Sequence, residues 1–484
     1  MTQYKLNNLS SFRLCAPLVW SGLERSCDIG AKFIIQLILA RLLGPEAFGV
    51  IALVLVFTTV GVGLMDAGLT QVIIQRESVS EEELSTVFTA NIIFALIITL
   101  TIFLTAPYVS AFYGRDELLP VLRMLSFSVL FVGCGRVQLG QLRRAVDFKK
   151  IASVTLPVQL ISGLISVLLA LNGYGVWALV VNVLLIALAE AFGYWIVCRW
   201  VPKAKPSFSS FRKMIPFGMH MACVRVINLI GENAIFIVIG RVHPLVQVGY
   251  LQRANSVRLL TANTLSIAIE RVIFPFFSRL QNNDFVLKNL YFKTFIVKGF
   301  VLATFAALLS ANAENVITLL LGSDWLQSAV YLKILCVYSI LYGLHRVVLV
   351  RLKAQAKGSQ LVVISALENI LILVGLWVAI GYGIEQCLWS MCVASLVSLL
   401  IKIVCLKRWY GYSVVLHLCA TISTLLIFGL FCFIINSLVL VHNLKDWVEI
   451  AVSLGVIIFM ASVILCGVVI FFPHTRLNFM RKYS

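Results

Sequence analysis

The sequence contains little charge. Only 12% of its 484 residues are Asp, Glu, Lys or Arg, whereas 61% are hydrophobic, and the mean hydropathy is +0.99. A soluble globular domain carries about 25% charged residues, so a chain of this length has too few polar side chains to cover itself in water. We therefore expect a membrane protein whose surface is covered by lipid.

The sequence also lacks the motifs of several chemical functions. Its 12 cysteines are scattered without a Cys-x-x-Cys pair, and its six histidines have no metal-ligand spacing, so we predict no metal site and no other cofactor. No Gly-x-x-x-x-Gly-Lys-Ser/Thr loop is present, which argues against direct use of ATP. The net charge of +18 is spread between apolar runs, which argues against nucleic acid as a partner and is typical of a protein beside anionic lipids.

Apolar runs of about 20 residues, the length that crosses a bilayer as a helix, recur along the chain. We place fourteen transmembrane spans near 15–40, 48–70, 84–105, 118–140, 151–171, 176–198, 214–240, 247–275, 291–311, 327–350, 360–380, 384–405, 413–437 and 447–472. The predicted fold is thus an all-α, polytopic membrane protein. The loops between the spans leave no room for a soluble catalytic domain, so we do not expect an enzyme.

The basic residues of these loops are distributed unevenly. On this map, 23 Lys and Arg residues lie in the loops on one side of the membrane, and only Arg41, Arg115, Arg241 and Lys445 lie on the other. Short basic loops remain in the cytoplasm. Both termini are therefore predicted to be cytoplasmic.

The two halves of the chain share a pattern. The tripeptide Gly-Tyr-Gly occurs at 173–175 and at 381–383, an offset of 208, and an offset of 200 relates Gly49 to Gly249. Because each half contains an even number of spans, the halves enter the membrane the same way, as parallel repeats do. We predict a six-helix lobe at 1–200, a second at 205–405, and accessory helices 13 and 14 with a short cytoplasmic tail at 406–484.

Several basic residues lie deep in the spans, where a charge costs roughly 2.5–3.5 kcal/mol. Arg25 and Lys32 share one stripe of the first span, and Arg225 lies 200 residues after Arg25 in span seven. Such stripes favour a polar interior between the halves, and guanidinium groups bind phosphate oxygens with two donors. We predict that a cationic cavity for an anionic substrate is lined by Arg25, Lys32, Arg225, Arg253 and Arg258.

Acidic residues accompany these bases. Glu24, Asp28, Asp66 and Glu232 either carry a coupling ion or act as counter-ions of the arginines, the role that we favour. The alternative to a cavity is a set of ion pairs, Arg25–Asp28 and Asp28–Lys32, that only hold helices together. A further group lies near the cytoplasmic ends of spans, where long side chains reach water; it consists of Arg136, Glu270, Arg271, Arg346 and Lys402.

One motif indicates a family. Residues 40–49 read ARLLGPEAFG, followed by DAGL at 66–69 and IQR at 74–76, and the second half contains LGSDW at 321–325. This pattern resembles the N-terminal signature of the polysaccharide transporter family, the Wzx-type flippases, and most closely its WzxC/colanic-acid branch.

The resemblance implies a member of the multidrug/oligosaccharidyl-lipid/polysaccharide exporter superfamily in the bacterial inner membrane. Such proteins move an undecaprenyl-pyrophosphate-linked oligosaccharide to the outer leaflet for exopolysaccharide, capsule or O-antigen (lipopolysaccharide) biosynthesis, by alternating access. The implied partners are the lipid-linked oligosaccharide, membrane lipids and the polysaccharide polymerase machinery. A lipid II-type flippase, a cation-coupled small-molecule exporter and a membrane-embedded glycan polymerase or ligase remain as alternatives; the last would need a long outer loop with catalytic groups.

Overall fold

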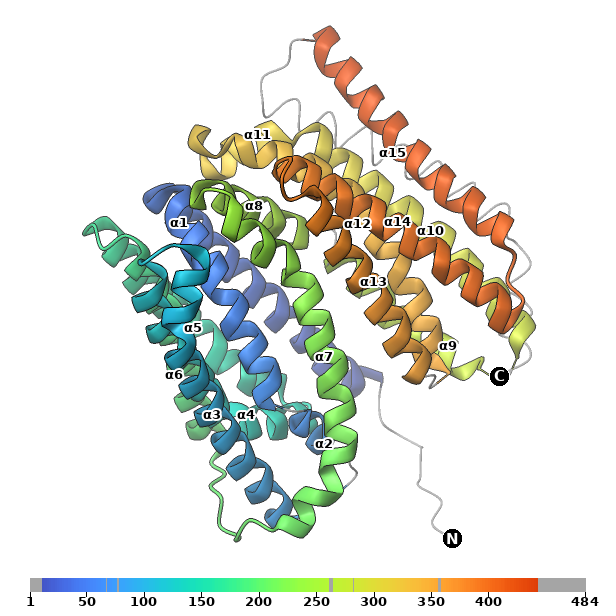
Figure 1. The fold of residues 1–484 in the computed structure, drawn as a ribbon. Helices are drawn as coiled ribbons and strands as arrows, with labels where there is room; N and C mark the ends of the chain where they lie inside the picture. Colours follow the sequence, from blue (N-terminus) through green and yellow to red (C-terminus); the bar gives the residue numbers. More distant parts are fainter. Residues whose placement is uncertain are drawn as a thin grey trace. The chain divides into compact units, whose positions relative to one another are not determined.

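The computed structural model describes residues 11–442, apart from 67, 76–77, 261–263, 282 and 356–357. All elements in these residues are helices (Figure 1). They are α1 (Ser11–Asp66), α2 (Leu69–Gln75), α3 (Glu81–Tyr113), α4 (Leu118–Arg144), α5 (Phe148–Leu171), α6 (Val176–Cys198), α7 (Phe208–Val242), α8 (Leu245–Arg258), α9 (Thr264–Arg279), α10 (Asp284–Ala311), α11 (Ala313–Leu321), the short 3-10 helix η2 (Ser323–Trp325), α12 (Gln327–Ala354), α13 (Gly358–Ala379), α14 (Ile384–Tyr410) and α15 (Val414–His442).

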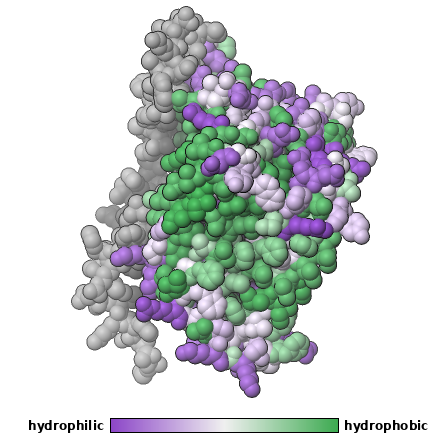
Figure 2. Space-filling model, turned by 90° about the vertical axis from the view of Figure 1, so that its left-hand side faces the viewer, coloured by the Kyte–Doolittle hydropathy of each residue, from purple (hydrophilic) through white to green (hydrophobic). Residues whose placement is uncertain are grey.

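The prediction of an all-helical polytopic membrane protein is confirmed. Within the described residues, ten helices are long and apolar enough to cross a membrane. Figure 2 shows the corresponding surface, a broad apolar band with most hydrophilic side chains gathered above and below it. Large apolar side chains of α3, α5 and α6, such as Leu104, Leu164 and Ile196, are exposed, as lipid contact requires. The predicted span at 447–472 lies outside the described residues.

Helix α1 contains the first predicted span and most of the second, which was expected to end at residue 70. Its 56 residues would measure about 84 Å as one straight helix, far more than the roughly 30 Å hydrocarbon core. The helix is interrupted at Gly44, whose φ of 71° and ψ of 177° are not helical. Glycine tolerates this conformation without steric cost, and Pro45 behind it suits the first position of the next helical segment. The Gly-Pro step of the motif therefore separates the two spans.

The predicted span at 247–275 is found as two helices, α8 and α9, with residues 261–263 between them outside the described part of the chain. Charged residues explain why hydropathy did not predict the helices correctly in this segment. Arg253 and Arg258 lie in α8, while Glu270 and Arg271 lie in α9. Neither helix is among the ten long apolar ones.

The chain forms two compact units. Unit 1 comprises residues 1–253 and 372–387, and unit 2 comprises residues 254–371 and 388–484. In unit 1, α1 packs against α4, α5 and α7, and α4 also packs against α3 and α6. In unit 2, α10 packs against α12 and α15, and α9 packs against α12. The division into repeats at 1–200 and 205–405 stays a prediction.

Within unit 1, two glycines allow the backbones of α1 and α8 to touch. A Cβ atom on Gly49 would lie 2.1 Å from the carbonyl oxygen of Leu245, and a Cβ atom on Gly249 would lie 1.8 Å from that of Pro45. The two contacts are reciprocal. Adding 200 to one member of the Pro45–Gly249 pair and subtracting it from the other gives the Gly49–Leu245 pair. The offset found in the sequence thus relates two contacts in space.

Candidate functional site

Unit 1 contains a cavity of about 560 Å³ whose walls come from α1, α2, α4, α6 and α7. Each long helix contributes one stripe of side chains, because residues three or four apart share a helix face. The stripe of α1 consists of Leu55, Thr58, Thr59, Val62, Gly63 and Asp66. That of α4 consists of Ser128, Val132, Arg136 and Arg143, and that of α6 of Val183, Ile186, Ala187 and Glu190. Helix α7 adds Arg225 and Leu229.

An ion pair lies in the wall of this cavity. The Nε of Arg136 on α4 is 3.5 Å from Oδ1 of Asp66 on α1, and the hydroxyl of Thr70 donates a hydrogen bond to the same carboxylate oxygen. Helix α1 ends at Asp66, and Gly68, with a φ of 71°, begins the turn into α2. The carboxylate therefore lies at the end of α1 and Thr70 in the first turn of α2. Contacts from α2 and α4 together orient the side chain of Asp66.

The remaining charges make the cavity cationic. Arg143, Arg225 and Glu190 lie in its wall together with Asp66 and Arg136, so three guanidinium groups face two carboxylates. Such a lining suits an anion, because guanidinium binds phosphate or carboxylate oxygens through paired donors.

The cavity also has groups for neutral hydroxyls. The hydroxyls of Thr58 and Ser128 donate to carbonyls of their own helices, so their oxygens keep acceptor capacity toward the cavity. Gln71, from α2, adds an amide to the wall.

The predicted site residues have different surroundings. Arg225 and Asp66 line the cavity. Lys32 and Asp28 form an ion pair along α1, with 3.0 Å between Nζ and Oδ1. This pair lies outside the lining of the cavity. It is one of the two ion pairs that we considered as a purely structural alternative. Arg25 and Glu24 lie in α1, but their side chains are outside the described part of the structure.

The other predicted residues lie on α7 and α8. The buried Arg253 stacks on the ring of Phe48, 4.2 Å from its centroid, and donates a 3.3 Å hydrogen bond to Gln36. Both contacts hold α8 to α1. Arg258, in unit 2, donates two hydrogen bonds to Asn255 on its own helix. The exposed Glu232 lies on α7, outside the lining of the cavity.

Two residues that we expected to reach water at the ends of spans are instead held in ion pairs. The side chain of Lys402 is 0% exposed and is bonded to Glu368 of the neighbouring helix α13. Arg346 is bonded to Glu270, another member of that group. The expectation was wrong for Lys402, which is buried against a carboxylate of an adjacent helix, while Arg346 is 26% exposed and also ion-paired. Arg136, from the same group, lines the cavity, and Arg271 is exposed.

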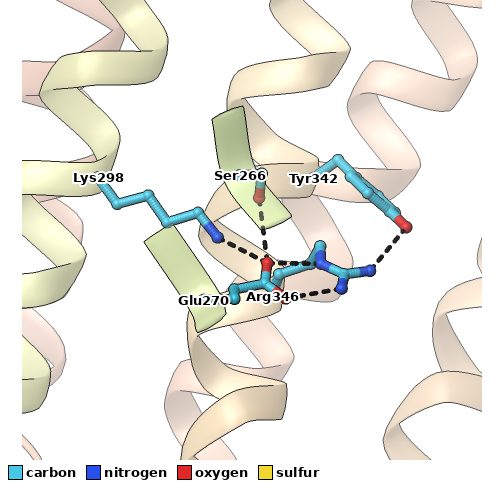
Figure 3. Close-up of polar contacts among 5 residues, drawn as sticks. All are labelled: Ser266, Glu270, Lys298, Tyr342 and Arg346. Atoms are coloured by element: carbon cyan, nitrogen blue, oxygen red, sulfur yellow. Dashed lines mark hydrogen bonds and ion pairs between the residues drawn. The ribbon is translucent and has the colours of Figure 1, made fainter. Parts of the chain in front are cut away.

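Unit 2 thus has a cluster around Glu270, shown in Figure 3. Arg346 on α12 donates two hydrogen bonds of 2.6 Å to the two carboxylate oxygens, and Lys298 on α10 donates one of 2.9 Å. Ser266 on α9 donates a fourth bond, of 3.1 Å, and Tyr342 lies 3.4 Å from Arg346. One carboxylate therefore joins three helices and balances one of two cations.

Sequence reasoning missed part of the site. Arg136 and Arg143 are seven residues apart and therefore share a face of α4, a signal as regular as the stripe that we noted in the first span. We counted Arg143 with the loops because it lies close to the end of its helix. Glu190 also lines the cavity, but the sequence does not show which face of α6 lies inward, since that helix is apolar on all sides.

Comparison with known proteins identifies the family. The family described as "Polysaccharide biosynthesis protein" matches residues 38–330, more than half of the chain. The chain belongs to this family. The prediction of a membrane transport protein of polysaccharide biosynthesis, and not of an enzyme, agrees with this family and with the transport protein among its relatives.

Curated relatives in bacteria agree with this assignment. The succinoglycan biosynthesis transport protein ExoT of Rhizobium meliloti is 28% identical over 306 residues, 63% of this chain and 62% of ExoT. The lipopolysaccharide biosynthesis protein WzxC of Escherichia coli is 24% identical over 330 residues, 66% of each chain. The teichuronic acid biosynthesis protein TuaB of Bacillus subtilis is 23% identical and matches 57% of this chain and 58% of TuaB. The matched segments span less than two thirds of each relative.

Solved structures share the fold. The lipid II flippase MurJ, in an inward closed conformation, superposes with a TM-score of 0.73 at 12% identity, covering 94% of this chain and 100% of MurJ. An inward-facing multidrug resistance MATE family transporter of the MOP superfamily gives a TM-score of 0.60 at 14% identity, covering 82% of this chain and 95% of that one. The chain therefore has the fold of these two transporters.

Proposed function

We propose that this protein moves an undecaprenyl-pyrophosphate-linked oligosaccharide from the inner to the outer leaflet of the bacterial inner membrane. The observation that carries the proposal is the family match over residues 38–330. The relatives named for succinoglycan, lipopolysaccharide and teichuronic acid have a polysaccharide as their common product. A membrane transporter for such products carries a precursor that is part lipid, part anion and part sugar.

The cavity of unit 1 supports the anionic and sugar parts of this substrate. Arg136, Arg143 and Arg225 supply donors for a pyrophosphate, while Thr58 and Gln71 offer partners for sugar hydroxyls. In this proposal the prenyl chain stays in the lipid phase because its transfer into a polar cavity is unfavourable.

We assign the remaining predicted cavity residues in the same way. Arg25, Lys32 and Arg258 are proposed to contact the substrate during alternating access, and Arg253 to hold α8 in place for it. Glu24, Asp28 and Glu232 are proposed as counter-ions of these bases. Cysteines introduced as Arg25→Cys, Arg225→Cys and Arg258→Cys should react with water-soluble thiol reagents. Protection at all three positions would contradict a shared aqueous cavity.

The finer features of the family resemblance belong to this proposal. They are cytoplasmic termini, a place in the WzxC/colanic-acid branch, and cooperation with a polysaccharide polymerase. At 24% identity, the similarity to WzxC is no stronger than that to ExoT at 28%. Either relative's glycan is therefore a reasonable first substrate to test.

The decisive experiment is deletion of the gene from its bacterial host. We expect lipid-linked oligosaccharide to accumulate on the cytoplasmic leaflet, with rescue by the wild type but not by Arg136→Ala or Arg225→Ala. Lys333→Ala is the control, since it removes an exposed cation, paired with Glu314 at 2.6 Å, from outside the cavity. Accumulation of lipid II would support the lipid II-type alternative, and loss of drug resistance alone would support the small-molecule exporter. Unchanged lipid-linked intermediates would overturn the proposal.

A further inference from the structure

A second buried polar cluster in unit 2 consists of Glu368 on α13, Lys402 on α14, and His345 on α12. The Nζ of Lys402 donates a hydrogen bond to Oε2 of Glu368 and lies 2.9 Å from Nδ1 of His345. The Nε2 of His345 lies 2.9 Å from the carbonyl oxygen of Ser395 on α14. The side chains of Lys402 and His345 are 0% and 1% exposed. Three ionisable groups are thus joined in one chain inside the helix bundle.

The protons are assigned here with Lys402 as an ammonium. The Nε2 of His345 lies 2.9 Å from both the carbonyl and the hydroxyl oxygen of Ser395, and with its hydrogen on Nε2 it donates to the carbonyl oxygen, which only accepts. The Lys402 ammonium donates one hydrogen to Glu368 and a second to Nδ1 of His345, which is therefore an acceptor. His345 is neutral in this arrangement. The cluster holds one negative and one positive charge, with a net charge of zero.

The cluster around Glu270 differs in one chemical respect. There the carboxylate is held by Arg346, whose guanidinium does not deprotonate in proteins, and by Lys298. A permanent positive charge therefore stays beside Glu270, even if Glu270 or Lys298 exchanges a proton. In the second cluster every member, Glu368, Lys402 and His345, is able to exchange a proton.

The route of a proton to the second cluster is limited. The side chain of Glu368 is 10% exposed, whereas those of His345 and Lys402 are 1% and 0% exposed, so a proton would enter this cluster at Glu368. Glu368 also interacts electrostatically with Arg346 and Tyr338 of α12. Arg258 in turn lies over the ring of Tyr338, 5.4 Å from its centroid.

We propose that Glu368, Lys402 and His345 form the proton-binding site that couples transport to a proton gradient, with the Glu368–Lys402 ion pair as its proton-free state. This inference rests on the proposed function and names the driving ion for it. A proton from water adds to a carboxylate oxygen of Glu368, and the hydrogen bond from Lys402 to that carboxylate loses its ionic character. No covalent bond other than the new O–H forms, and the net charge rises from zero to +1.

The added charge gives the conformational consequence. An unpaired ammonium is costly in the low-dielectric interior, so protonation favours a state in which Lys402 reaches water or another anion. Since the cluster joins α12, α13 and α14, such a state requires these helices to rearrange. Release of the proton on the other side restores the pair. One proton would therefore accompany each cycle.

The test compares two variants that each remove an ion pair without changing net charge. Glu368→Gln/Lys402→Met empties the proposed site but leaves no buried charge unpaired, which keeps such variants folded. Glu270→Gln/Lys298→Met is the control, because it removes a buried pair in the same unit and leaves that cluster's net charge of one positive unchanged, on the partly exposed Arg346. Both proteins and the wild type are reconstituted at full length in liposomes with a fluorescent lipid-linked oligosaccharide.

With one proton per substrate, a pH difference of one unit across the liposome should change the leaflet ratio of substrate about tenfold. We expect this change for the wild type and for the Glu270→Gln/Lys298→Met control, and no response to pH for Glu368→Gln/Lys402→Met. A full response in the latter would overturn the proposal, and so would a wild-type ratio that follows a sodium gradient instead of the pH difference.

A second measurement does not depend on the substrate. Infrared difference spectra of the proteins in lipid, recorded as the pH is lowered, should contain a slowly exchanging protonated-carboxyl band. This band should be missing only from Glu368→Gln/Lys402→Met, and its absence from the wild type or its persistence in that variant would refute the site. If the wild type moves no lipid-linked oligosaccharide while the band behaves as expected, the proposed function fails and the proton site stands.

Discussion

Replacement of Gly249 by alanine is expected to force α8 away from α1. The new Cβ would lie 1.8 Å from the carbonyl oxygen of Pro45, whereas non-bonded carbon contacts begin at about 3.5 Å. The backbones must therefore separate by more than an ångström, and neither has a flexible side chain there that could move instead. Gly49→Ala meets the carbonyl oxygen of Leu245 at 2.1 Å and is expected to act in the same way.

The cost follows from two opposing contributions. Overpacking costs about 1–3 kcal/mol, and more where backbone must move, while alanine in place of glycine stabilises a helix by about 1 kcal/mol. We expect a net destabilisation of about 2 kcal/mol for Gly249→Ala and Gly49→Ala. Gly30 is the control, since it lies in the same helix as Gly49 and a Cβ atom added to it would have nothing within 4 Å. Gly30→Ala should be neutral or stabilising.

The assay is thermal unfolding of the purified proteins in detergent, followed as the fraction that stays monodisperse after heating. Gly249→Ala and Gly49→Ala should lose this fraction several degrees below the wild type, and Gly30→Ala should not. Equal behaviour of all three variants would refute the close contact between α1 and α8.

Three further predictions concern single positions. Arg136→Ala, which removes the ionic partner of Asp66 in the cavity, should slow transport of labelled substrate about tenfold or more, the equivalent of a charged hydrogen bond of roughly 1.5–3 kcal/mol; a rate within twofold of the wild type would count against a role for this pair. Gly44→Ala should lower the unfolding temperature, because a φ of 71° with a ψ of 177° costs another residue about 1–3 kcal/mol. Asp147 accepts a hydrogen bond from the backbone N–H of Lys150 at the start of α5, so Asp147→Ala should cost about 1 kcal/mol. Partial burial raises the pKa of Asp147, but the hydrogen bonds and the charge of Lys150 lower it more and hold it below its usual range. Because a carboxylate with a lowered pKa stabilises only while ionised, the difference between Asp147→Ala and the wild type should shrink as the pH falls below about 4.

The sequence was a good guide to the spans because crossing a bilayer depends on length and hydropathy alone. The predicted spans at 118–140, 151–171 and 176–198 lie within α4, α5 and α6. The break between the first two spans was also readable, since Gly44 and Pro45 are the residues that a helix interruption requires.

The partners of the buried charges were not readable in the same way. Glu270 pairs with residues 28 and 76 positions later, and a single sequence contains no measure of which helices are neighbours. The rotation of each helix is equally hidden, because a helix that is apolar on all sides has no face that marks the interior. For this reason the sequence did not place Glu190 in the cavity, and Lys402 was expected to reach water.

The reciprocal contact between Pro45 and Gly249 and between Gly49 and Leu245 also bears on how such a chain arises. Contacts that exchange when the two halves are exchanged are those of an isologous interface, the kind that identical subunits form across a twofold axis. On the predicted division into two repeats, two separate copies of the first half, each with its own Pro45 and Gly49, would be able to make this contact. The meeting of α1 and α8 therefore has the pattern that a twofold interface between such copies would have.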